Sequence, residues 1–546
     1  MKDNLGSLLE AVADLAEARD PGRVALIQGD RERTWAELNR RAPALAGHLA
    51  RSGVASGDRV GIGLYNSIEY IESLLAAFKM RAVPFNLNYR YRSGELADVL
   101  ALTSASAVVY DGTLSERIAT VAQRMPGLRA LIEVGEGSER PPRATTFADA
   151  VLGPAQERRH RGPGDQVVLL TGGTTGRPKG VVWDHAGVIG AVSSVYRRVG
   201  LDPPADRSAV LAAAAAAVDE GTAPVMLPAS PLMHGTGFFF SLGNLLLAGR
   251  VVLLVGRSFD PAEAWSAVQR HRVHELAIVG DAFGRPLLAE LERAVAAGTP
   301  YDLSSLRRVV SSGVPWSRDI KEGFLRAGQM TLQDSIAATE GGPFGGAMSG
   351  PGAGRVTTRF MLGPGARVLR PDGTDVTHGS GEVGELAATG SLPLGYLDDP
   401  EGTAAVFRTI GGVRYAVPGD AARVEADGTL TLLGRGSGVV NTGGEKVFAE
   451  EVEAVLVGHP DVEEAVVVGV PDPRWGSRVT ALVRAAPGKL PSPEALSTYV
   501  GRTLAGYKRP RQVVVVPRIE RTPAGKIDRR WTQQRALEAS GGREPP

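Results

Sequence analysis

Short runs of aliphatic and β-branched residues alternate with amphipathic segments along most of the chain. The runs at residues 59–64, 107–110, 251–255 and 276–279 have the length and composition of buried strands. The segment at residues 262–272 instead repeats its apolar residues at helical spacing. Strands that alternate with helices pack as α/β layers, in which the sheets are largely parallel. The sequence therefore predicts an α/β fold with mostly parallel sheets.

The spacing of turn signals changes beyond residue 385, where pairs of Asp, Gly and Pro come closer together. A chain of 546 residues also exceeds the size at which one hydrophobic core stops growing. We therefore expect a large α/β domain over residues 1–435, a small α+β domain over residues 436–546 and a hinge at residues 435–437. In the small domain, strands are predicted at residues 465–470 and 480–483, and helices at residues 450–457 and 493–503.

The charge balance and the absence of cysteine exclude several classes of protein. The 61 Lys and Arg residues nearly cancel the 60 Asp and Glu residues, which argues against binding to DNA or RNA. Without cysteine there is no disulfide, no cysteine nucleophile and no thiolate metal site, so any reactive thiol arrives with a substrate. The apolar residues 237–256 are interrupted by Asn244 and Arg250 and predict a buried helix and strand, not a membrane span. The N-terminus lacks the features of a signal peptide, so we expect a cytoplasmic protein.

A loop rich in glycine, threonine and cations follows the apolar run at residues 167–170. Residues 171–180 read TGGTTGRPKG, and glycines there allow backbone N–H groups to approach phosphate oxygens closely. The loop is not a Walker A motif, because Lys179 is followed by Gly180 and not by Ser or Thr. A plain glycine-rich turn would not explain why Arg177 and Lys179 stand beside two threonines. The loop therefore predicts a phosphate site outside the P-loop class.

Further motifs follow this loop along the chain. They read PLMHGTG at residues 231–237, IAATE at residues 336–340, YAVPGD at residues 415–420, GR at residues 434–435 and PAGKI at residues 523–527. Together with the loop, this set resembles the superfamily of acyl-CoA synthetases, luciferases and peptide-synthetase adenylation domains over essentially the whole chain. The resemblance implies an acyl-CoA synthetase that uses ATP to convert a carboxylic acid into its acyl-AMP and then transfers the acyl group to coenzyme A.

The resemblance also implies a role for individual residues. Glu340 would bind Mg²⁺, which suits a lone carboxylate beside phosphate oxygens, and Thr339 would contact the α-phosphate. His234 would lie beside the acyl pocket, and Lys526 would bridge the substrate carboxylate and the α-phosphate during adenylation. The β- and γ-phosphates would be held by Thr171, Thr174, Thr175 and Lys179, with Gly172, Gly173 and Gly176 in the same loop. Gly313, Asp334 and Ala337 would line the nucleotide site, Asp420 and Arg435 would bind the ribose, and Gly443, Gly444 and Lys446 would line the coenzyme A channel.

Ala337 departs from the family pattern, which usually has glycine at this position. A displacement of about 1 Å can slow an attack step roughly 100-fold, whereas the thioester step has no pyrophosphate to accommodate. The sequence therefore leaves three alternatives open: a complete two-step ligase, an enzyme that only transfers preformed acyl-AMP to coenzyme A, and a non-catalytic acyl-AMP-binding protein. A carrier protein in place of coenzyme A also stays open.

Several segments resemble an actinobacterial branch of the family that acts on bulky acids, including steroid side-chain acids. They are residues 85–91, 171–176, 280–286 and 441–446. The expected pocket wall suits a large apolar acid of steroid-like, terpenoid-like or long-chain type, and it comprises residues 238–240, Val279, Ala282, Val314, Ala337 and Ala338. Neither the identity of the acid nor a homodimer is decided by the sequence.

Two other patterns indicate structure and not function. Residues 379–384 fit GxGxxG but precede a predicted strand, so they predict a turn and not a dinucleotide site. His271 and His274 would face a metal from one side of a helix, yet no third ligand stands nearby in the sequence. We interpret them as a surface pair.

Overall fold

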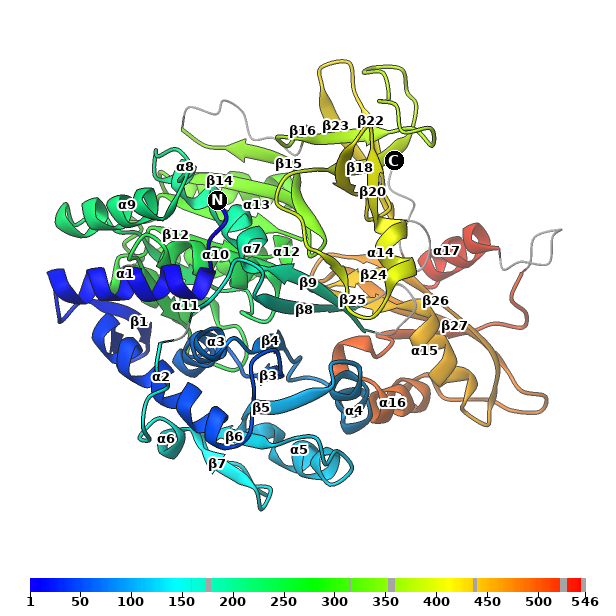
Figure 1. The fold of residues 1–546 in the computed structure, drawn as a ribbon. Helices are drawn as coiled ribbons and strands as arrows, with labels where there is room; N and C mark the ends of the chain where they lie inside the picture. The colour runs from blue at the N-terminus through cyan, green and yellow to red at the C-terminus, as the bar shows by residue number, and fades with distance from the viewer. Residues whose placement is uncertain are drawn as a thin grey trace. The chain divides into compact units, whose positions relative to one another are not determined.

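The structure is a computed structural model, and it describes residues 1–158, 160–172, 178–313, 316–351, 359–435, 439–520 and 528–541. The chain forms two compact units, whose ribbon Figure 1 draws from blue at the N-terminus to red at the C-terminus. The first unit contains residues 1–89, 97–170 and 180–433. The second contains residues 90–96, 171–179 and 434–546.

A long mixed sheet forms the centre of the first unit. In the described residues its order is β2 (Arg31–Thr34), β1 (Val24–Gln28), β11 (Arg250–Leu253), β10 (Val225–Pro228), β12 (Glu275–Ile278), β13 (Arg308–Ser312), β14 (Thr331–Ala338), β15 (Gly341–Ser349), β16 (Phe360–Leu362), β23 (Thr429–Arg435), β22 (Asp420–Val424), β18 (Gly384–Ala388), β21 (Val413–Ala416) and β20 (Phe407–Ile410), with β17 (Ala366–Leu369) beside β18. The pairs from β1 to β14 are parallel, whereas β2, β15 and β16 pair antiparallel. The parallel part therefore brings the carboxyl ends of β12, β13 and β14 to one edge.

A second sheet carries the strands on either side of the glycine-rich loop. Its order is β19 (Gly395–Tyr396), β9 (Pro178–Asp184), β8 (Gln166–Gly172), β4 (Val83–Asn86), β3 (Arg59–Gly63), β5 (Ala105–Asp111), β6 (Ala130–Val134) and β7 (Ala144–Thr146). The short strand β19 pairs antiparallel with β9, so residues from far along the chain lie beside the strand that follows the loop.

A series of helices before residue 434 accompanies these two sheets. They are α1 (Leu5–Arg19), α2 (Trp35–Arg51), α3 (Ile68–Met80), α4 (Ser93–Leu102), α5 (Ser115–Ala122), α6 (Phe147–Ala150), α7 (His185–Val192), α8 (Ser194–Arg198), α9 (Arg207–Asp219), α10 (Gly235–Leu245), α11 (Pro261–His271), α12 (Gly280–Ala296), α13 (Arg318–Ala327) and α14 (Pro400–Val406), with the 3₁₀ turn η1 (Gly112–Leu114). Side-chain caps begin several of them: the Thr34 hydroxyl accepts from the backbone N–H of Glu37 at the start of α2.

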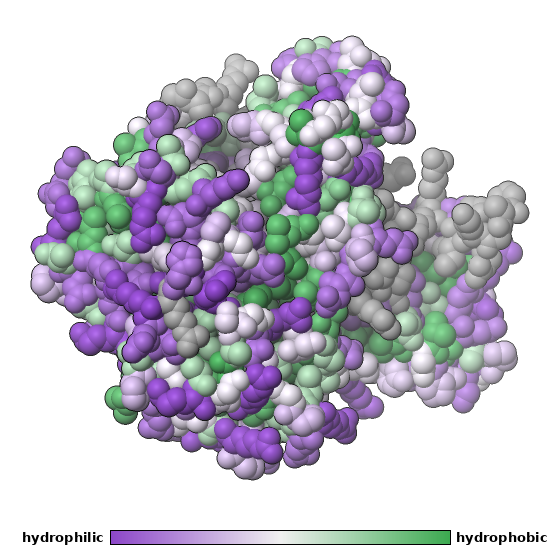
Figure 2. Space-filling model, in the orientation of Figure 1, coloured by the Kyte–Doolittle hydropathy of each residue, from purple (hydrophilic) through white to green (hydrophobic). Residues whose placement is uncertain are grey.

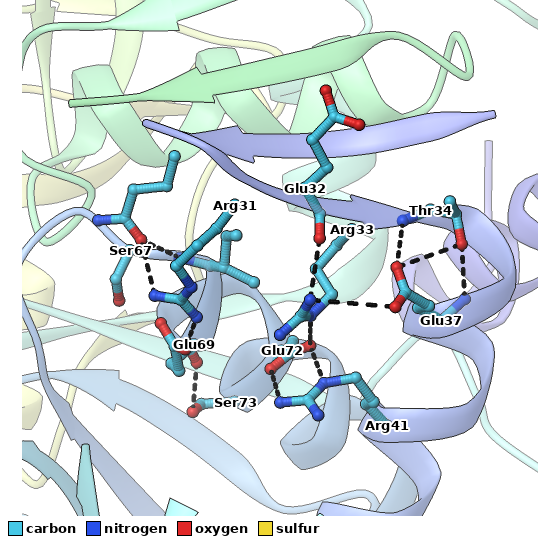
Figure 3. A network of polar contacts seen from close by, with 12 residues as sticks. Arg31, Glu32, Arg33, Thr34, Glu37, Arg41, Ser67, Glu69, Glu72 and Ser73 are labelled. Atoms are coloured by element: carbon cyan, nitrogen blue, oxygen red, sulfur yellow. Dashed lines mark hydrogen bonds and ion pairs between the residues drawn. The ribbon is translucent and has the colours of Figure 1, made fainter. Parts of the chain in front are cut away.

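An ion-pair network connects β2, α2 and α3 (Figure 3). Glu72 of α3 is fully buried, and its carboxylate lies 2.5 Å from Nε of Arg41 and 3.3 Å from Nε of Arg33. Arg31 pairs with Glu69 one turn earlier in α3. A buried carboxylate needs such partners, because an unpaired charge inside a protein costs several kcal/mol. The network thus fixes where the first helices lie against the edge strand.

The second unit has its own sheet and core. The sheet order is β25 (Glu445–Phe448), β24 (Val439–Thr442), β27 (Gly476–Ala485) and β26 (Val462–Asp472), with β28 (Gln512–Val515) beside β27. The helices α15 (Ala449–Val457), α16 (Pro493–Thr503) and α17 (Arg529–Glu538) accompany it, with the 3₁₀ turn η2 (Gly506–Lys508). Val452 and Leu456 of α15 pack on Val467 and Val483 of the sheet, so this unit buries a separate hydrophobic core.

The predicted α/β fold with a large N-terminal and a small C-terminal part is confirmed. The predicted runs at residues 59–64 and 276–279 coincide with β3 and β12 to within a residue, and the predicted helix at residues 262–272 is α11. Residues 237–256 form most of α10 followed by β11, as expected for a buried helix and strand. No described helix is long and apolar enough to cross a bilayer. Figure 2 shows hydrophilic residues interspersed with apolar ones over the face that it draws.

Candidate functional site

Glu340 lies in the turn that follows β14 and is only 6% exposed. Its Oε1 accepts a hydrogen bond from the Tyr396 hydroxyl over 2.8 Å. Its Oε2 is buried and has no hydrogen-bond partner among the described residues. A buried carboxylate oxygen without a partner is costly, unless a cation or a donor is present in the working state. Glu340 therefore has one oxygen fixed by the fold and one oxygen available to a ligand.

Two strands of the second sheet position this turn. Tyr396 reaches Glu340 because β19 pairs with β9 through Gly395 to Val182 and Tyr396 to Val181. Trp183 of β9 donates its indole N–H to the backbone carbonyl of Thr339 over 3.1 Å. The residues implied to contact the α-phosphate and the metal are thus held by one side chain from β9, the strand after the glycine-rich loop, and one from its partner β19.

The chemistry of Glu340 fits a magnesium ion held together with phosphate oxygens. Mg²⁺ usually takes one or two carboxylates from the protein and completes its octahedron with substrate phosphates and water. Within the described ranges no group of three or more His, Asp or Glu residues has the geometry of a protein-only metal centre. His274, one of the two histidines weighed as ligands, accepts a hydrogen bond from the backbone N–H of Val225 through Nδ1.

Ala337 stands in a β-bulge near the end of β14. The pairing with β15 shifts register between Ile336 and Ala338, so Ala337 lies outside the regular ladder and is exposed. Across from it, a Cβ at Gly342 would lie 3.3 Å from the methyl carbon of Ala337. The methyl group is therefore accommodated in the protein by a glycine on the partner strand.

Asp334, which the sequence assigned to the nucleotide site, makes structural contacts instead. It is 2% exposed, and its Oδ2 lies 3.1 Å from Nζ of Lys321 and accepts from the backbone N–H of Trp316 over 3.3 Å. Burial raises the pKa of Asp334, although the positive charge of Lys321 lowers it. Asp334 points to the face of β14 that also buries Leu332 in the core, so we do not retain it as a cofactor ligand.

The ends of the glycine-rich loop belong to neighbouring strands. Thr171 and Gly172 end β8, and Lys179 is the second residue of β9. Thr171 and Lys179 are both half-buried. The residues between them, Gly173, Thr174, Thr175, Gly176 and Arg177, lie outside the described residues. The described residues thus form two strands, β8 and β9, that flank the expected phosphate loop.

Two further predicted residues lie at the ends of elements of the first unit. His234 is the N-cap residue of α10, and its side chain does not cap the helix. Gly313 follows β13 with φ +96, is exposed, and would bring an added Cβ to 3.7 Å from Val279. Gly313 therefore lies at the carboxyl ends of the strands and has a backbone conformation that favours glycine.

The residues implied to bind ribose lie on β22 and β23. Asp420 is the first residue of β22, is half-buried, and follows Gly419, whose φ of +88 turns the chain into the strand. Arg435 is the last residue of β23. Their strands are neighbours in the long sheet.

The segment implied to line the coenzyme A channel is a tight hairpin. Gly443 and Gly444 have φ +57 and +83 and join β24 to β25, with Thr442 opposite Glu445 and Asn441 opposite Lys446. Two consecutive positive φ values are typical of the two-residue type I′ turn, which explains the glycine pair. The backbone N–H of Gly443 donates to the carbonyl of Trp475 over 2.9 Å.

Besides the loop residues, three further predicted features fall outside the described residues. They are Lys526, the hinge residue Ser437 and the pocket residue Val314.

Tyr396 and Trp183 were missed from the sequence. Both contacts join residues that are far apart along the chain, and the pairing of β19 with β9 that makes the first contact involves only two residues of β19. The only sequence signal for Trp183 is its position in the apolar run after the glycine-rich loop. The only sequence signal for Tyr396 is that an aromatic residue follows Gly395.

Comparison with known proteins gives a consistent result over the whole chain. The family model described as AMP-binding enzyme matches residues 13–397, and the model described as AMP-binding enzyme C-terminal domain matches residues 451–526. A medium/long-chain-fatty-acid–CoA/3-oxocholest-4-en-26-oate–CoA ligase from Mycobacterium marinum is 40% identical over 545 residues, covering 96% of this chain and 96% of that protein. A 3-oxocholest-4-en-26-oate–CoA ligase from Rhodococcus rhodochrous is 39% identical, covering 97% of this chain and 95% of that protein.

Solved structures share the fold. The amide bond synthetase McbA from Marinactinospora thermotolerans superposes with a TM-score of 0.74 at 25% identity, covering 96% of this chain and 99% of that one. The o-succinylbenzoate CoA synthetase MenE from Bacillus subtilis superposes with a TM-score of 0.77 at 23% identity, covering 98% of this chain and 99% of that one.

Proposed function

The chain belongs to the AMP-binding enzyme family and is an acyl-CoA ligase, and from this premise we propose that it activates a bulky apolar carboxylic acid in two steps. The acid reacts with ATP to give acyl-AMP and pyrophosphate, and the thiol of coenzyme A then displaces AMP to give the thioester. In this proposal both steps occur in the cytoplasm.

The buried, unpartnered Oε2 of Glu340 is the observation that supports the adenylation step. Because the Tyr396 hydroxyl already occupies Oε1, a cation is the ligand that best satisfies Oε2. Mg²⁺ bound there with phosphate oxygens would neutralise charge on ATP and on the departing pyrophosphate. Thr339 precedes Glu340, its backbone carbonyl is held by Trp183, and in this proposal it would contact the α-phosphate.

The remaining residues would position the two substrates. Thr171 and Lys179, with the loop between them, would hold the β- and γ-phosphates, where a fixed cation lowers the cost of bringing two anions together. Asp420 would accept hydrogen bonds from the ribose hydroxyls, and Arg435 would contact the same sugar. Lys526 would bridge the acid carboxylate and the α-phosphate during attack.

The thioester step would use the glycine hairpin of the second unit. Gly443 and Gly444 lack side chains, so an extended pantetheine chain would be able to pass close to their backbone. Lys446, two residues further along β25, would lie beside this path. His234 at the start of α10 would border the acyl group during both steps.

The acid we propose is a steroid side-chain acid or a long-chain fatty acid. Relatives of this chain at 39–40% identity are named as ligases for 3-oxocholest-4-en-26-oate and for medium and long fatty acids. The described part of the expected pocket wall is apolar, with Phe238, Phe239, Phe240, Val279, Ala282 and Ala338. Such a wall suits a large apolar body more than the α-ammonium group of an amino acid substrate.

The alternatives to a complete ligase are less favoured. The CoA ligases among the relatives argue against a non-catalytic binding protein. Ala337 had suggested loss of adenylation, but it lies in an exposed bulge opposite Gly342, whose missing side chain leaves room for the methyl group. We therefore expect Ala337→Gly to change the adenylation rate by less than about 3-fold, far below the roughly 100-fold effect of a misplaced reacting group.

The test measures each half-reaction of the full-length protein separately. Acid-dependent exchange of radiolabelled pyrophosphate into ATP reports adenylation, and acyl-CoA formation from synthetic acyl-AMP reports thioester transfer. Glu340→Gln should reduce the exchange rate by about 100-fold or more, as expected for losing a preorganised electrostatic group. The same variant should retain most of the transfer from supplied acyl-AMP.

Glu385→Gln is the matched control, because this β18 glutamate lies in an exposed ion pair with Arg408. It should leave both half-reactions unchanged. If the protein forms acyl-CoA from supplied acyl-AMP but shows no pyrophosphate exchange, it catalyses only the second step. No acyl-CoA from any acid or adenylate would overturn the proposed function.

A further inference from the structure

A cluster of charges lies at the amino ends of two strands, on the edge of the sheet opposite Gly313. Glu275 begins β12 and Arg308 begins β13, and the two residues are register partners. Oε1 of Glu275 lies 3.0 Å from Nη1 of Arg308 and 2.9 Å from Nε of Arg198, the last residue of α8. The exposed fractions of the Arg198 and Glu275 side chains are 8% and 10%, so the pair is almost removed from water.

This cluster has more positive than negative charge. Two guanidinium groups share the single carboxylate of Glu275, which leaves one positive charge without a counterion. Burial lowers the pKa of Arg198, Glu275 raises it and Arg308 lowers it again. An arginine stays protonated in proteins, so the excess charge persists at neutral pH.

Several hydrogen-bond donors of the cluster have no acceptor in the described chain. The two terminal nitrogens of Arg198 make no hydrogen bond there, and its Nε is close to Glu275 without the geometry of a hydrogen bond. Nε of Arg308 is also buried without a partner. Arg308 anchors α8 by donating to the backbone carbonyl of Arg198 over 3.2 Å, and this structural role explains Arg308. It does not explain the free donors of Arg198.

The ring of Phe240 in α10 contacts both this cluster and the apolar sheet surface. The guanidinium carbon of Arg198 lies 4.6 Å from the centre of that ring, a distance typical of a cation–π contact. Phe240 also packs on Ala277 of β12 and Val310 of β13. These residues lie two positions after Glu275 and Arg308, on the same face of the sheet. Phe240 is only partly buried, so it does not seal this cluster completely within the core.

One face of the sheet therefore leads from the arginines to the residues proposed for activation. Alternate residues share a face, so Arg308 is followed by Val310 and then by Ser312, next to Gly313. Thr331 of β14 is the register partner of Arg308, and Ala337 lies six residues further along that strand. At about 3.3 Å per residue, the bulge at Ala337 is roughly 20 Å along the sheet from the arginines.

We propose that Arg198, supported by Arg308, is a specificity-determining residue that donates hydrogen bonds to an oxygen acceptor at the remote end of the acid substrate. The acceptor is a ketone or a carboxylate, joined to the reacting carboxyl group by an apolar body about 20 Å long. This inference rests on the proposed function, since activation near Ala337 and Glu340 is part of that proposal. An acid that ends in a plain methyl or methylene group would leave the donors of Arg198 unsatisfied.

The test compares matched acids that differ only at the remote end. One pair is a steroid side-chain acid with a ring ketone and the same acid without the ketone. The other pair is a long α,ω-dicarboxylic acid and the monocarboxylic acid of equal length. The wild-type kcat/KM for acyl-CoA formation should be about 10- to 100-fold higher for the acceptor-bearing member of at least one pair, as expected for a hydrogen bond to a charged group.

Arg198→Met keeps much of the apolar side chain and removes the donors. It should reduce the preference within that pair to about 1, with kcat/KM for the plain acid kept within about 2-fold, because only the acceptor contact is lost. Arg197→Met, at the exposed preceding position of α8, is the matched control and should keep the preference. A preference for the ketone alone or for the dicarboxylate alone identifies the acceptor.

Equal wild-type efficiency within both pairs would overturn the inference, even if Arg198→Met failed to fold. An equal loss for both members of a pair in Arg198→Met would do the same, because it would indicate a structural role only. Both results require acyl-CoA formation by the wild type. They are thus distinct from failure of the proposed function, in which no acid yields acyl-CoA.

Discussion

The Tyr396 hydroxyl group donates to Oε1 of Glu340 over 2.8 Å, so a two-residue strand orients the carboxylate that follows β14. This contact leaves Oε2 as the only oxygen of Glu340 without a partner among the described residues. A group that orients a ligand is often as necessary for metal binding as the ligand itself.

Tyr396→Phe should therefore weaken binding of Mg-ATP. Loss of one hydrogen bond to a buried carboxylate costs about 1 to 2 kcal/mol, which corresponds to a KM for Mg-ATP that is about 5- to 30-fold higher. Steady-state kinetics at varied Mg-ATP would measure it. Tyr301→Phe is the control, because that hydroxyl donates to Glu290 over 2.7 Å away from the site. Equal KM values for Mg-ATP in both variants would show that Tyr396 has no role in binding Mg-ATP.

His185 should make the fold sensitive to acid. It is 1% exposed, neither ring nitrogen has a partner in the described chain, and burial lowers its pKa to about 4. Asp165 raises this pKa and Arg161 lowers it, both by less than burial. Because the pKa in the folded state lies below the unfolded value of about 6.5, the stability contributed by neutral His185 is complete above that value and is lost as the pH falls toward 4.

The expected loss from His185 between about pH 7.5 and about pH 4.5 is roughly 2.5 kcal/mol. Urea unfolding of wild type and His185→Leu at both pH values would measure it, and the variant should lose less stability by about this amount. His160→Leu, at an exposed position, is the control and should follow the wild type. Parallel pH profiles for wild type and His185→Leu would contradict the prediction.

Gly443→Ala should destabilise the second unit. The added Cβ at φ +57 would lie 2.8 Å from the Trp475 ring, whereas a Cβ at Gly488, with φ +73, would meet nothing within 4 Å. Both substitutions carry the left-handed strain of about 1 to 2 kcal/mol, and crowding should add about 1 to 3 kcal/mol at Gly443 alone. Hydrogen exchange of amides in β24 and β27 would measure the difference. Equal exchange in the two variants would exclude crowding by Trp475.

Glu72→Gln should destabilise the first unit, because it leaves Arg33 and Arg41 without their shared buried carboxylate. Breaking a buried ion pair from one side typically costs about 3 to 5 kcal/mol. The free energy of urea unfolding would measure the loss. Glu32→Gln, at an exposed position of β2, should cost less than about 0.5 kcal/mol. A similar small cost for Glu72→Gln would mean that the network in Figure 3 contributes little.

Local sequence patterns were sufficient to predict the elements whose structure depends on residues close together in the sequence. The apolar run that became β12 and the glycine pair in the β24–β25 hairpin depend on strand composition and turn geometry. Strand alternation also held the signal that Asp334 belongs with Leu332 on the core face, whereas its place at the nucleotide site was implied only by the family resemblance. Its partner Lys321 lies on a helix, and no local pattern connects the two.

The contacts that complete the candidate site are tertiary and could not be predicted. Glu340 and Tyr396 are 56 residues apart, and the pairing of β19 with β9 depends on the packing of the whole sheet. The cluster of Arg198 and Glu275 has the same origin, since α8 and β12 meet only after the strands between them have paired. Sequence reasoning finds residue types at such sites, and the fold decides which of them meet.

The parallel pairing of β1 with β11 has a consequence for synthesis of the protein. Leu26 pairs with Val251, so the N-terminal strand lacks its neighbour until more than two hundred further residues have left the ribosome. At about 5 to 20 residues per second, this wait lasts roughly 10 to 50 s. During that time the hairpin of β1 and β2 exposes an unpaired strand edge, which is where a nascent chain is prone to aggregate. Chaperone binding to ribosome-bound chains should therefore fall sharply once residue 253 has emerged.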